Sequence, residues 1–401
     1  MPSASASASA SRRPRPRRPA RARDVLMVLV YVLLVCVPAL GLAGVVPDFR
    51  LDGSIVVHER PKLARASWED ESFQPLFAAW FESRLGLRGT FALADNTVLY
   101  HAFHETKLGA PVKLGGDGVL LNDEDTLYFN RTDLPSEVVL DAFAARIANL
   151  QTQLQKQGAA LVPVIIPSKT TIYPDRVEPK WRKPLPSPRP SDVAYANLVR
   201  GLRDRGVAFV DARALLTARA EPRAYLYARG ARHWSYLASC LATQRIFESY
   251  GALTGRSAPS YACDYVTRAD APLLHEDYDL LRLMNVWGAR PDVDRDPVVF
   301  LEPGPAQIVE PVDVLVVGTS FCWNFLKDSQ RGAALGRTHF FYYNRRLFDW
   351  PSSAEQELVP DSPAWRNAAL GKQLYILDLF ESYPMPRYAT EFLDQMEAAL
   401  P

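Results

Sequence analysis

Apolar runs of strand length alternate with longer helical patterns over about the last two thirds of this 401-residue chain. Residues 136–158 place their apolar side chains on one helix face, with Ser136 at the start and Gly158 as the stop, and the apolar run 159–167 follows as a buried strand. Helix patterns recur at 191–206 and 235–251, and strand patterns recur at 207–216, 312–317 and 372–380. Strands that alternate with helices form parallel sheets. The sequence therefore predicts the α/β class, with a parallel sheet flanked by helices.

Composition divides the chain into four predicted parts. Residues 1–24 are Ser/Ala-rich and then Arg/Pro-rich, so they cannot bury a core and are expected to be a disordered, basic cytoplasmic tail. Residues 25–46 are predicted to be a transmembrane helix, and 47–135 a helical and irregular N-terminal part of the extracytoplasmic domain. Residues 136–401 form the predicted α/β domain, with Ser191 and Ser235 as helix N-caps and Gly251 as a helix stop.

The predicted membrane anchor consists of 22 uncharged residues preceded by seven arginines. As a helix it would rise roughly 33 Å, enough for a bilayer core, and arginines on the N-terminal side keep that end in the cytoplasm. A cleaved signal peptide is the alternative, but the apolar run is long and lacks a small-x-small cleavage site. The preference for arginine over lysine indicates a bacterium. The predicted location is therefore the bacterial inner membrane, single-pass, with the catalytic domain in the periplasm.

Charge and cysteine spacing exclude several functional classes. The net charge is +1, and the arginine-rich tail leaves the rest of the chain with an excess of about five negative charges, so no nucleic acid is expected as a partner. No cysteine spacing resembles a zinc knuckle, and no phosphate-binding glycine loop is present, so we expect no metal and no cofactor. Three cysteines lie outside the anchor: Cys240, Cys263 and Cys322. Either one pair forms a disulfide, with Cys240 and Cys263 closest in sequence, or all three are reduced, buried thiols.

Two residues have the chemistry of a nucleophile and its base. Ser320 lies just past the apolar strand 312–317, where α/β proteins place their active sites, and Gly318 and Thr319 form the turn that precedes it. Backbone amides of this turn are expected to face an oxyanion. His233 precedes a predicted helix and is a candidate general base for Ser320. A turn serine that caps a helix and a packed histidine beside Trp234 are the alternative interpretations.

Six segments stand out in order along the chain: HERPKLA (58–64), FESRLGLRGTFALADN (81–96), GGDGVLLN (115–122), IIPSKTTIYPDRV (165–177), LYARGARHW (226–234) and VLVVGTSF (314–321). Through them the chain resembles, from about residue 58 to 385, the alginate O-acetyltransferase family, the AlgX/AlgJ-like proteins with an SGNH-hydrolase-like domain. The resemblance implies an SGNH-hydrolase-like α/β domain in which Ser320 is the nucleophile and His233 the general base. It also implies an O-acetyltransferase of exopolysaccharide biosynthesis, with a polysaccharide acceptor and a membrane-bound O-acyltransferase as partner.

One departure from the family pattern concerns the acid of the triad. The family has Asp-x-His-Trp where this chain has Ala231-Arg232-His233-Trp234, so the usual triad acid is missing. Loss of that acid lowers the rate by roughly 10⁴ in a serine hydrolase. Asp211, Asp264 and Asp270 are candidate substitutes, although no spacing places any of them near His233.

Because the usual triad acid is missing at Ala231, the sequence is also compatible with other functions. A catalytically silent relative that binds polysaccharide or scaffolds an export complex is one alternative, and an acetyl esterase that uses the same residues is another. In the segment 340–350 the residues Tyr342, Tyr343, Arg345 and Arg346 are candidate contacts for acidic sugars. The pattern of that segment also fits a strand with a buried aromatic face and a solvated turn, which is the interpretation it favours.

Overall fold

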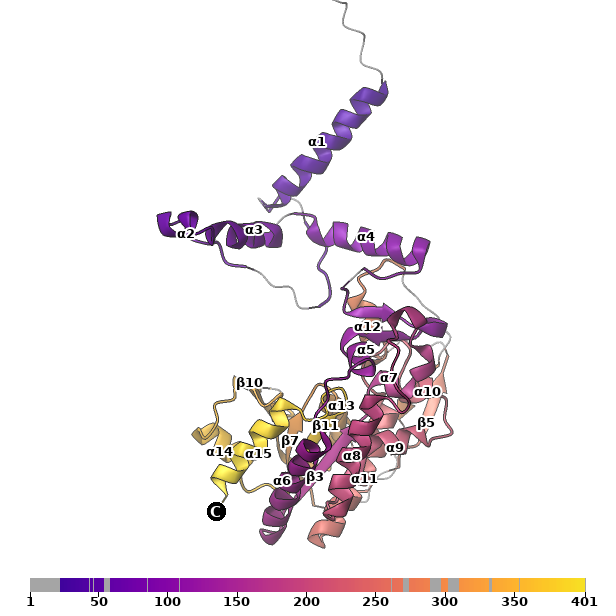
Figure 1. Ribbon diagram of the computed structural model, residues 1–401, viewed down its shortest axis with the longest axis vertical. Helices are drawn as coiled ribbons and strands as arrows, with labels where there is room; N and C mark the ends of the chain where they lie inside the picture. Colours follow the sequence, from indigo (N-terminus) through magenta and orange to yellow (C-terminus); the bar gives the residue numbers. More distant parts are fainter. Residues whose placement is uncertain are drawn as a thin grey trace, which may run out of the picture. The chain divides into compact units, whose positions relative to one another are not determined.

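The structure is a computed structural model, and it describes residues 22–400 except 43, 46, 54–57, 85, 108, 261, 270–273, 289–296, 302–309, 332–333 and 353. The chain forms two compact units, Met1–Ala94 and Asp95–Pro401. The first unit contains α1 (Ala22–Leu42), α2 (Arg65–Glu69) and α3 (Phe73–Arg84), and α4 (Arg88–Phe103) continues into the second (Figure 1). Residues 1–21 of the predicted disordered tail lie outside the described residues.

Residues 25–42 of the apolar stretch lie in helix α1, but the predicted transmembrane helix is wrong. In the part of the chain that the structure describes, no helix is long and apolar enough to cross a membrane. Helix α1 includes Arg23 and Asp24 and ends at Leu42. The predicted inner-membrane anchor and the periplasmic location that followed from it are wrong for the same reason.

The second unit is built on a seven-stranded sheet in the order β10-β9-β8-β7-β11-β3-β4. The strands of the unit are β1 (Val112–Leu114), β2 (Leu120–Asn122), β3 (Ala160–Ile166), β4 (Val210–Asp211), β5 (Tyr265–Arg268), β6 (Val298–Leu301), β7 (Val312–Gly318), β8 (Leu335–Tyr342), β9 (Arg346–Trp350), β10 (Ala354–Glu357) and β11 (Leu374–Phe380). The five strands from β8 to β4 are parallel, as predicted, while β9 and β10 continue the sheet antiparallel. The pairs β1–β2 and β5–β6 form two small antiparallel sheets.

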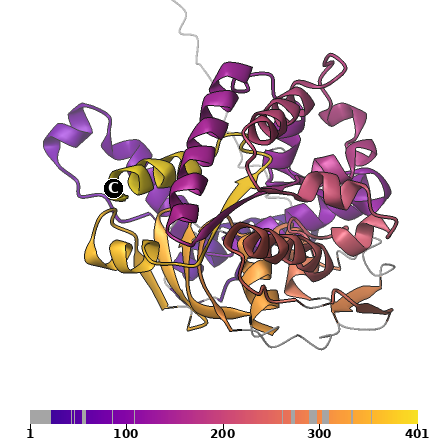
Figure 2. The same ribbon diagram turned by 90° about the horizontal axis from the view of Figure 1, so that it is seen from below.

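Helices cover both faces of the sheet (Figure 2). The helices of the unit are α5 (Asp123–Phe129), α6 (Glu137–Lys156), α7 (Lys169–Ile172), α8 (Pro190–Asp204), α9 (Ala212–Thr217), α10 (Arg223–Leu226), α11 (Tyr236–Thr254), α12 (Asp279–Leu283), α13 (Cys322–Arg331), α14 (Pro363–Ala369) and α15 (Arg387–Ala399). Because successive strand residues point to opposite faces, Val314 and Val316 of β7 pack with α11 and α13, while Leu315 and Val317 pack with α6, α8 and α15. Both faces of the interior strands are therefore apolar, which explains their continuous apolar runs.

Three element boundaries differ from the prediction for local reasons. Helix α8 begins at Pro190, whose fixed φ suits the first helical position, so Ser191 lies inside the helix and Arg189 is the N-cap. Helix α11 starts after Ser235 as predicted but continues past Gly251 to Gly255, which ends it in the left-handed conformation at φ 71°. Only two residues of 207–216 are strand, because the Asp211 carboxylate accepts a hydrogen bond from the Ala214 amide and starts α9.

A disulfide joins Cys240 of α11 to Cys263, which lies just before β5. This is the pairing that the sequence offered as one of two alternatives. The bond connects a buried helix to the segment that leads into the small β5–β6 sheet. Cys322 is a free, buried thiol, and burial raises its pKa far above the usual value.

Candidate active site

The structure brings Ser320 and His233 into hydrogen-bonding contact. Ser320 follows β7 at the carboxyl edge of the parallel strands, and His233 lies two residues before Ser235, the N-cap of α11. The distance between His233 Nε2 and Ser320 Oγ is 2.7 Å. In open α/β sheets this edge is where side chains converge on a ligand. The pair therefore lies where the fold class places its chemistry.

Neighbouring contacts fix the two segments against each other. The Trp234 indole N–H donates to the Phe321 carbonyl at 3.0 Å, and the Asn324 side-chain amide donates to the Trp234 carbonyl at 2.8 Å. The rings of His233 and Phe321 meet edge to face with centroids 4.8 Å apart. These contacts join His233 and Trp234 to the residues that follow Ser320, so they limit how far Ser320 and His233 can move apart.

The other nitrogen of His233 contacts Asp279, a residue that the sequence analysis did not select. His233 Nδ1 lies 2.5 Å from Asp279 Oδ2, and the second carboxylate oxygen accepts hydrogen bonds from the Arg232 amide at 2.7 Å and the Leu280 amide at 2.8 Å. Burial alone would raise the pKa of Asp279, but the hydrogen bonds from His233 and Arg232 outweigh burial and hold that pKa below its usual value. Asp279 is therefore suited to stay ionised beside the imidazole.

Asp279 takes this place because α12 is attached to the loop that precedes His233. The Leu280 and Leu281 amides donate to the Gly230 carbonyl at 3.1 and 3.2 Å. Ala231 is buried in the same loop, and its side chain is only a methyl group. The carboxylate that contacts the His233 imidazole thus comes 48 positions after Ala231 in the sequence.

The three acids proposed from the sequence do not take this role. Asp211 accepts hydrogen bonds from the Ala214 amide and the Tyr195 hydroxyl, and Asp264 is exposed. Asp270 lies outside the described residues. The segment 274–283 carries Glu276, Asp277 and Asp279 without a periodic pattern or a known motif. No sequence signal separated Asp279 from its acidic neighbours.

The buried Lys169 holds the loop that leads to His233. Its side chain is fully buried, and its ammonium group donates to the carbonyls of Ala228 at 2.9 Å, Arg229 at 2.7 Å and Ala231 at 2.5 Å. The Tyr173 hydroxyl donates to the Tyr227 carbonyl at 2.8 Å, from the same segment of the chain as Lys169. The segment 165–177, on which part of the family resemblance rests, therefore supports residues 227–233, which we call the histidine loop.

A buried aspartate of β11 holds the turn that carries Ser320. The Thr319 amide and hydroxyl donate to Asp378 Oδ2 at 2.8 and 2.6 Å. A Cβ atom on Gly318 would lie 2.4 Å from the Asp378 Cβ, so only glycine fits this position. Burial raises the pKa of Asp378 to about 6, although the hydrogen bonds from Thr319 lower it. The expected turn residues Gly318 and Thr319 thus connect the Ser320 segment to the neighbouring strand.

The candidate sugar contacts lie in the hairpin between β8 and β9. Arg345 pairs with Glu391 at 2.9 Å, and Arg346 pairs with Glu355. Tyr342 packs among aromatic rings that include Trp323, and Tyr343 contacts Tyr342 and Tyr388. Both tyrosines are partly buried, so the strand with an aromatic face is present. Contact of these four residues with a sugar stays a prediction.

Comparison with known proteins gives one family. The sequence matches the family model described as "SGNH hydrolase-like domain, acetyltransferase AlgX" over residues 112–331. A Pseudomonas aeruginosa protein named "Probable alginate O-acetylase AlgJ" is 27% identical over 185 residues, which are 46% of this chain and 43% of that protein. The match thus spans less than half the length of that relative.

Two solved structures are similar to the chain at low identity. The O-acetyltransferase domain of Pseudomonas putida AlgJ is 20% identical with a TM-score of 0.44, and the match covers 72% of this chain and 99% of that one. AlgX of Pseudomonas aeruginosa is 16% identical with a TM-score of 0.42, and the match covers 71% of this chain and 66% of that one. The family model covers more than half of the chain, including His233, Asp279 and Ser320, so this protein belongs to the acetyltransferase AlgX family with an SGNH hydrolase-like α/β domain.

Proposed function

We propose that this chain is an O-acetyltransferase that moves an acetyl group to a hydroxyl of a polysaccharide through Ser320, His233 and Asp279. The observation that carries the proposal is the continuous hydrogen-bonded series from Ser320 Oγ through both nitrogens of His233 to Asp279, with distances of 2.7 and 2.5 Å. A nucleophile, a base and an acid that orients the base are the parts of a serine acyl-transfer site.

In the first half-reaction Ser320 Oγ attacks the carbonyl carbon of an acetyl ester while His233 Nε2 takes the hydroxyl proton. The bond between that carbon and the donor oxygen then breaks, and the departing alcohol takes the proton from His233. Asp279 keeps the Nδ1–H tautomer of the imidazole and stabilises the imidazolium. Acetyl-Ser320 and the free donor alcohol result.

The oxyanion of this step needs hydrogen-bond donors that are fixed before the reaction. The Thr319 amide is already bound to Asp378, whereas the Ser320 amide donates to no acceptor in the hydrogen bonds of the described residues. We therefore assign the Ser320 amide to the oxyanion. The bonds from Thr319 to Asp378 keep that amide in a fixed orientation.

In the second half-reaction a sugar hydroxyl gives its proton to His233 Nε2 and attacks the acetyl carbon. The carbon–oxygen bond to Ser320 breaks, and Ser320 Oγ takes the proton back from His233. The product is an O-acetylated sugar and the free enzyme. The acceptor polysaccharide, and a membrane-bound O-acyltransferase that supplies the acetyl groups, are proposed from the family resemblance.

Asp279 bears on the two alternatives. The hypothesis of a catalytically silent relative was based on the missing acid at Ala231. A carboxylate in contact with His233 Nδ1 removes that reason for preferring the hypothesis. The esterase alternative differs only in the acceptor, which is water instead of a sugar hydroxyl. Transfer and hydrolysis are therefore separated by measuring products.

The test is turnover of a small activated acetyl ester by the full chain, beside Ser320→Ala and His233→Ala. The proposal expects turnover that falls at least about a thousandfold in both variants. It also expects O-acetylated oligosaccharide, detected by mass spectrometry, when a polysaccharide fragment is added. Turnover that survives in Ser320→Ala contradicts the proposal, and acetate as the sole product with every acceptor supports the esterase.

A further inference from the structure

The acid of the proposed site belongs to a segment with little structure of its own. Asp279 is the first residue of α12, a helix of five residues whose N-cap, Tyr278, makes no side-chain capping bond. Helices shorter than about 12 residues are marginal on their own in water. After Asp279 the segment is fixed by the buried Leu280 side chain and by the Leu280 amide, which donates to the Gly230 carbonyl at 3.1 Å. The position of the carboxylate therefore also depends on what holds the residues before it.

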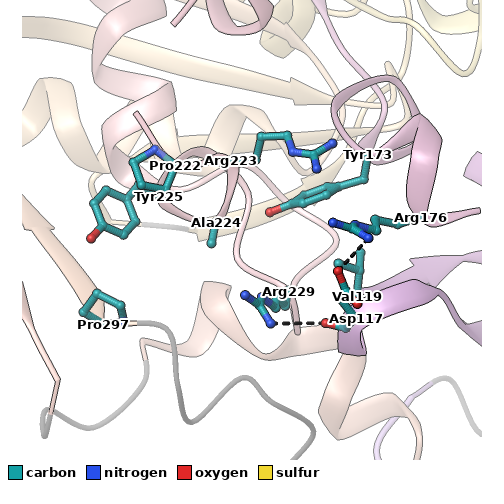
Figure 3. A pocket seen from close by; sticks show the side chains of 10 residues that line it. All are labelled: Asp117, Val119, Tyr173, Arg176, Pro222, Arg223, Ala224, Tyr225, Arg229 and Pro297. Atoms are coloured by element: carbon teal, nitrogen blue, oxygen red, sulfur yellow. Dashed lines mark hydrogen bonds and ion pairs between the residues drawn. The ribbon is translucent and has the colours of Figure 1, made fainter. Parts of the chain in front are cut away.

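The histidine loop has anchors outside this segment. Arg229 Nη1 donates to the Asp117 carbonyl at 3.2 Å, beside a pocket in which Arg176 pairs with the carboxylate of the same aspartate (Figure 3). Lys169 binds three carbonyls of the loop. Since the base is anchored in this way, the contact between base and acid depends on how the segment of the acid is held.

Glu276 joins the residues before the acid to two helices. Its Oε1 accepts a hydrogen bond from the Tyr236 hydroxyl at 3.0 Å and pairs with the Lys327 ammonium group. Tyr236 is the first residue of α11, three positions after His233. Lys327 lies in α13, whose first residue comes two positions after Ser320. One carboxylate thus links the segment of the acid to the helices that follow the candidate base and the candidate nucleophile.

The ion pair with Lys327 also balances charge. Glu276, Asp277 and Asp279 are three acids within four positions, and the Lys327 ammonium group offsets the repulsion between their carboxylates. The Glu276 side chain is only 15% exposed. Burial alone would raise the pKa of Glu276, but the hydrogen bond from Lys327 outweighs burial and holds that pKa below its usual value. Glu276 therefore stays ionised and paired at neutral pH.

We propose that Glu276 is a positioning residue of the acyl transfer, which holds the segment of Asp279 against α11 and α13 so that the Asp279 carboxylate stays on His233 Nδ1. The inference rests on the proposed function and adds a residue that acts through Asp279. A misplacement of about 1 Å can cost about 10²-fold in rate. The effect of Glu276 cannot exceed that of removing the Asp279 carboxylate, and it disappears once that carboxylate is gone.

The test is a double-mutant cycle between Glu276→Ala and Asp279→Asn in the full chain, measured by kcat and KM for turnover of the activated acetyl ester. Lys327→Met, which keeps the aliphatic part of the side chain, repeats the cycle from the other partner of the ion pair. The matched control is Glu397→Ala, because Glu397 of α15 pairs with Arg146 of α6 at 2.9 Å on the other face of the sheet. Circular dichroism confirms that each variant is folded.

Glu276→Ala is expected to lower kcat about tenfold and to change KM by less than about threefold. In the Asp279→Asn background the same change should lower kcat by less than about twofold, and Glu397→Ala should leave kcat unchanged in both backgrounds. An equal loss in both backgrounds means that Glu276 supports the fold and not the acid, which overturns the proposal. An unchanged kcat in folded Glu276→Ala overturns it as well.

A second measurement does not depend on turnover. A histidine Nδ1–H that donates to a carboxylate gives a proton NMR signal far downfield, and its absence in His233→Ala assigns it to the bond with Asp279. The signal should weaken or disappear in Glu276→Ala and persist in Glu397→Ala. Loss of the signal in Glu276→Ala, in a protein without ester turnover, contradicts the proposed acetyl transfer and leaves the positioning of Asp279 by Glu276 standing. An unchanged signal in Glu276→Ala overturns that positioning.

Discussion

At the level of single residues, the proposed acyl transfer depends on which carboxylate contacts His233. The family position of that acid is Ala231, and its methyl group cannot orient an imidazole. Asp279 makes the contact from another element, and the Arg232 and Leu280 amides fix its second oxygen. A triad is recognised by geometry and not by sequence position, so a substituted acid is compatible with full catalytic roles for Ser320 and His233.

Asp279→Asn is expected to lower the rate of ester turnover by about 10²–10⁴ because an amide cannot stabilise the imidazolium and favours the wrong tautomer. Steady-state kinetics of the folded variant measure the effect. Asp264→Asn serves as the control, since Asp264 is an exposed acid from the same region and should leave the rate unchanged. A rate in Asp279→Asn within about twofold of the parent contradicts the assignment of this acid.

Asp279 also links stability to pH. Its pKa is lower in the folded protein than in the unfolded chain, so its contribution is fully present above the unfolded pKa of about 3.9. The contribution disappears as the pH falls through the lower folded value. Urea denaturation of the parent and of Asp279→Asn should therefore give a difference in unfolding free energy that shrinks below about pH 4. A difference that grows on acidification contradicts this account.

At the level of secondary-structure elements, two buried side chains act as supports for His233 and Ser320. Lys169 binds the loop that leads to His233, and Asp378 binds the turn that precedes Ser320. Each support comes from the end of a strand of the central sheet, β3 or β11, or from the residues just after it. Both are buried ionisable groups with several hydrogen bonds. The fold therefore holds Ser320 and His233 in place through polar groups inside an apolar sheet.

Lys169→Met should lower kcat for ester turnover by about 10- to 100-fold because three carbonyls of the histidine loop lose their donor. KM should change by less than about threefold, because Lys169 contacts the loop and not the substrate. Lys156→Met, at an exposed lysine of α6, is the control and should match the parent in both constants. An unchanged kcat in folded Lys169→Met contradicts a positioning role.

Asp378→Asn should raise the free energy of unfolding at neutral pH by about 1–3 kcal/mol. Burial raises the pKa of Asp378 to about 6, so the ionised form is disfavoured in the folded protein and stability declines between about pH 4 and 6. The asparagine oxygen still accepts both bonds from Thr319, and it removes this decline. Chemical denaturation across this pH range is the measurement, and a parent-like decline in Asp378→Asn refutes the explanation.

At the level of the whole molecule, the sequence predicted the fold class but not the complete order of its strands. The near-continuous apolar runs of β3, β7 and β11 predicted buried parallel strands, and they are the centre of the sheet. The placement of β11 between β7 and β3 depends on contacts between distant segments, which local patterns do not encode. The same limit applies to β9 and β10, whose antiparallel pairing follows from a hairpin after β8.

The sequence proposed Ser320 and His233 from motifs, and their catalytic roles stay a prediction. Ser320 and His233 belong to segments that resemble the family, whereas Asp279 belongs to a short helix without a motif, and its place depends on the bonds of Leu280 and Leu281 to Gly230. The membrane anchor was predicted from the length of an apolar run, but the helix that forms there ends at Leu42. Local sequence patterns thus indicated the types of residue at the candidate site better than they indicated the residues at which helices end.

The Cys240–Cys263 disulfide should stabilise the second unit by about 3 kcal/mol, as expected for a bond that closes a loop of 23 residues. Cys263→Ser should therefore lower the midpoint of denaturant unfolding, and a reducing agent should lower the midpoint of the parent to the same value. Cys36→Ser, at an exposed free cysteine, is the control. An identical midpoint in the parent and in Cys263→Ser contradicts the contribution of this bond.

The most direct test of the central claim is detection of the acetyl-enzyme. The full chain is mixed with an activated acetyl ester, quenched in acid and digested, and the peptide that contains Ser320 is analysed by mass spectrometry. The account predicts one acetyl group on Ser320 in the parent, no acetyl group at that position in Ser320→Ala, and much slower acetylation in His233→Ala. A folded parent that turns over the ester without acetylating Ser320, or that carries the acetyl group on another residue as an intermediate, contradicts it.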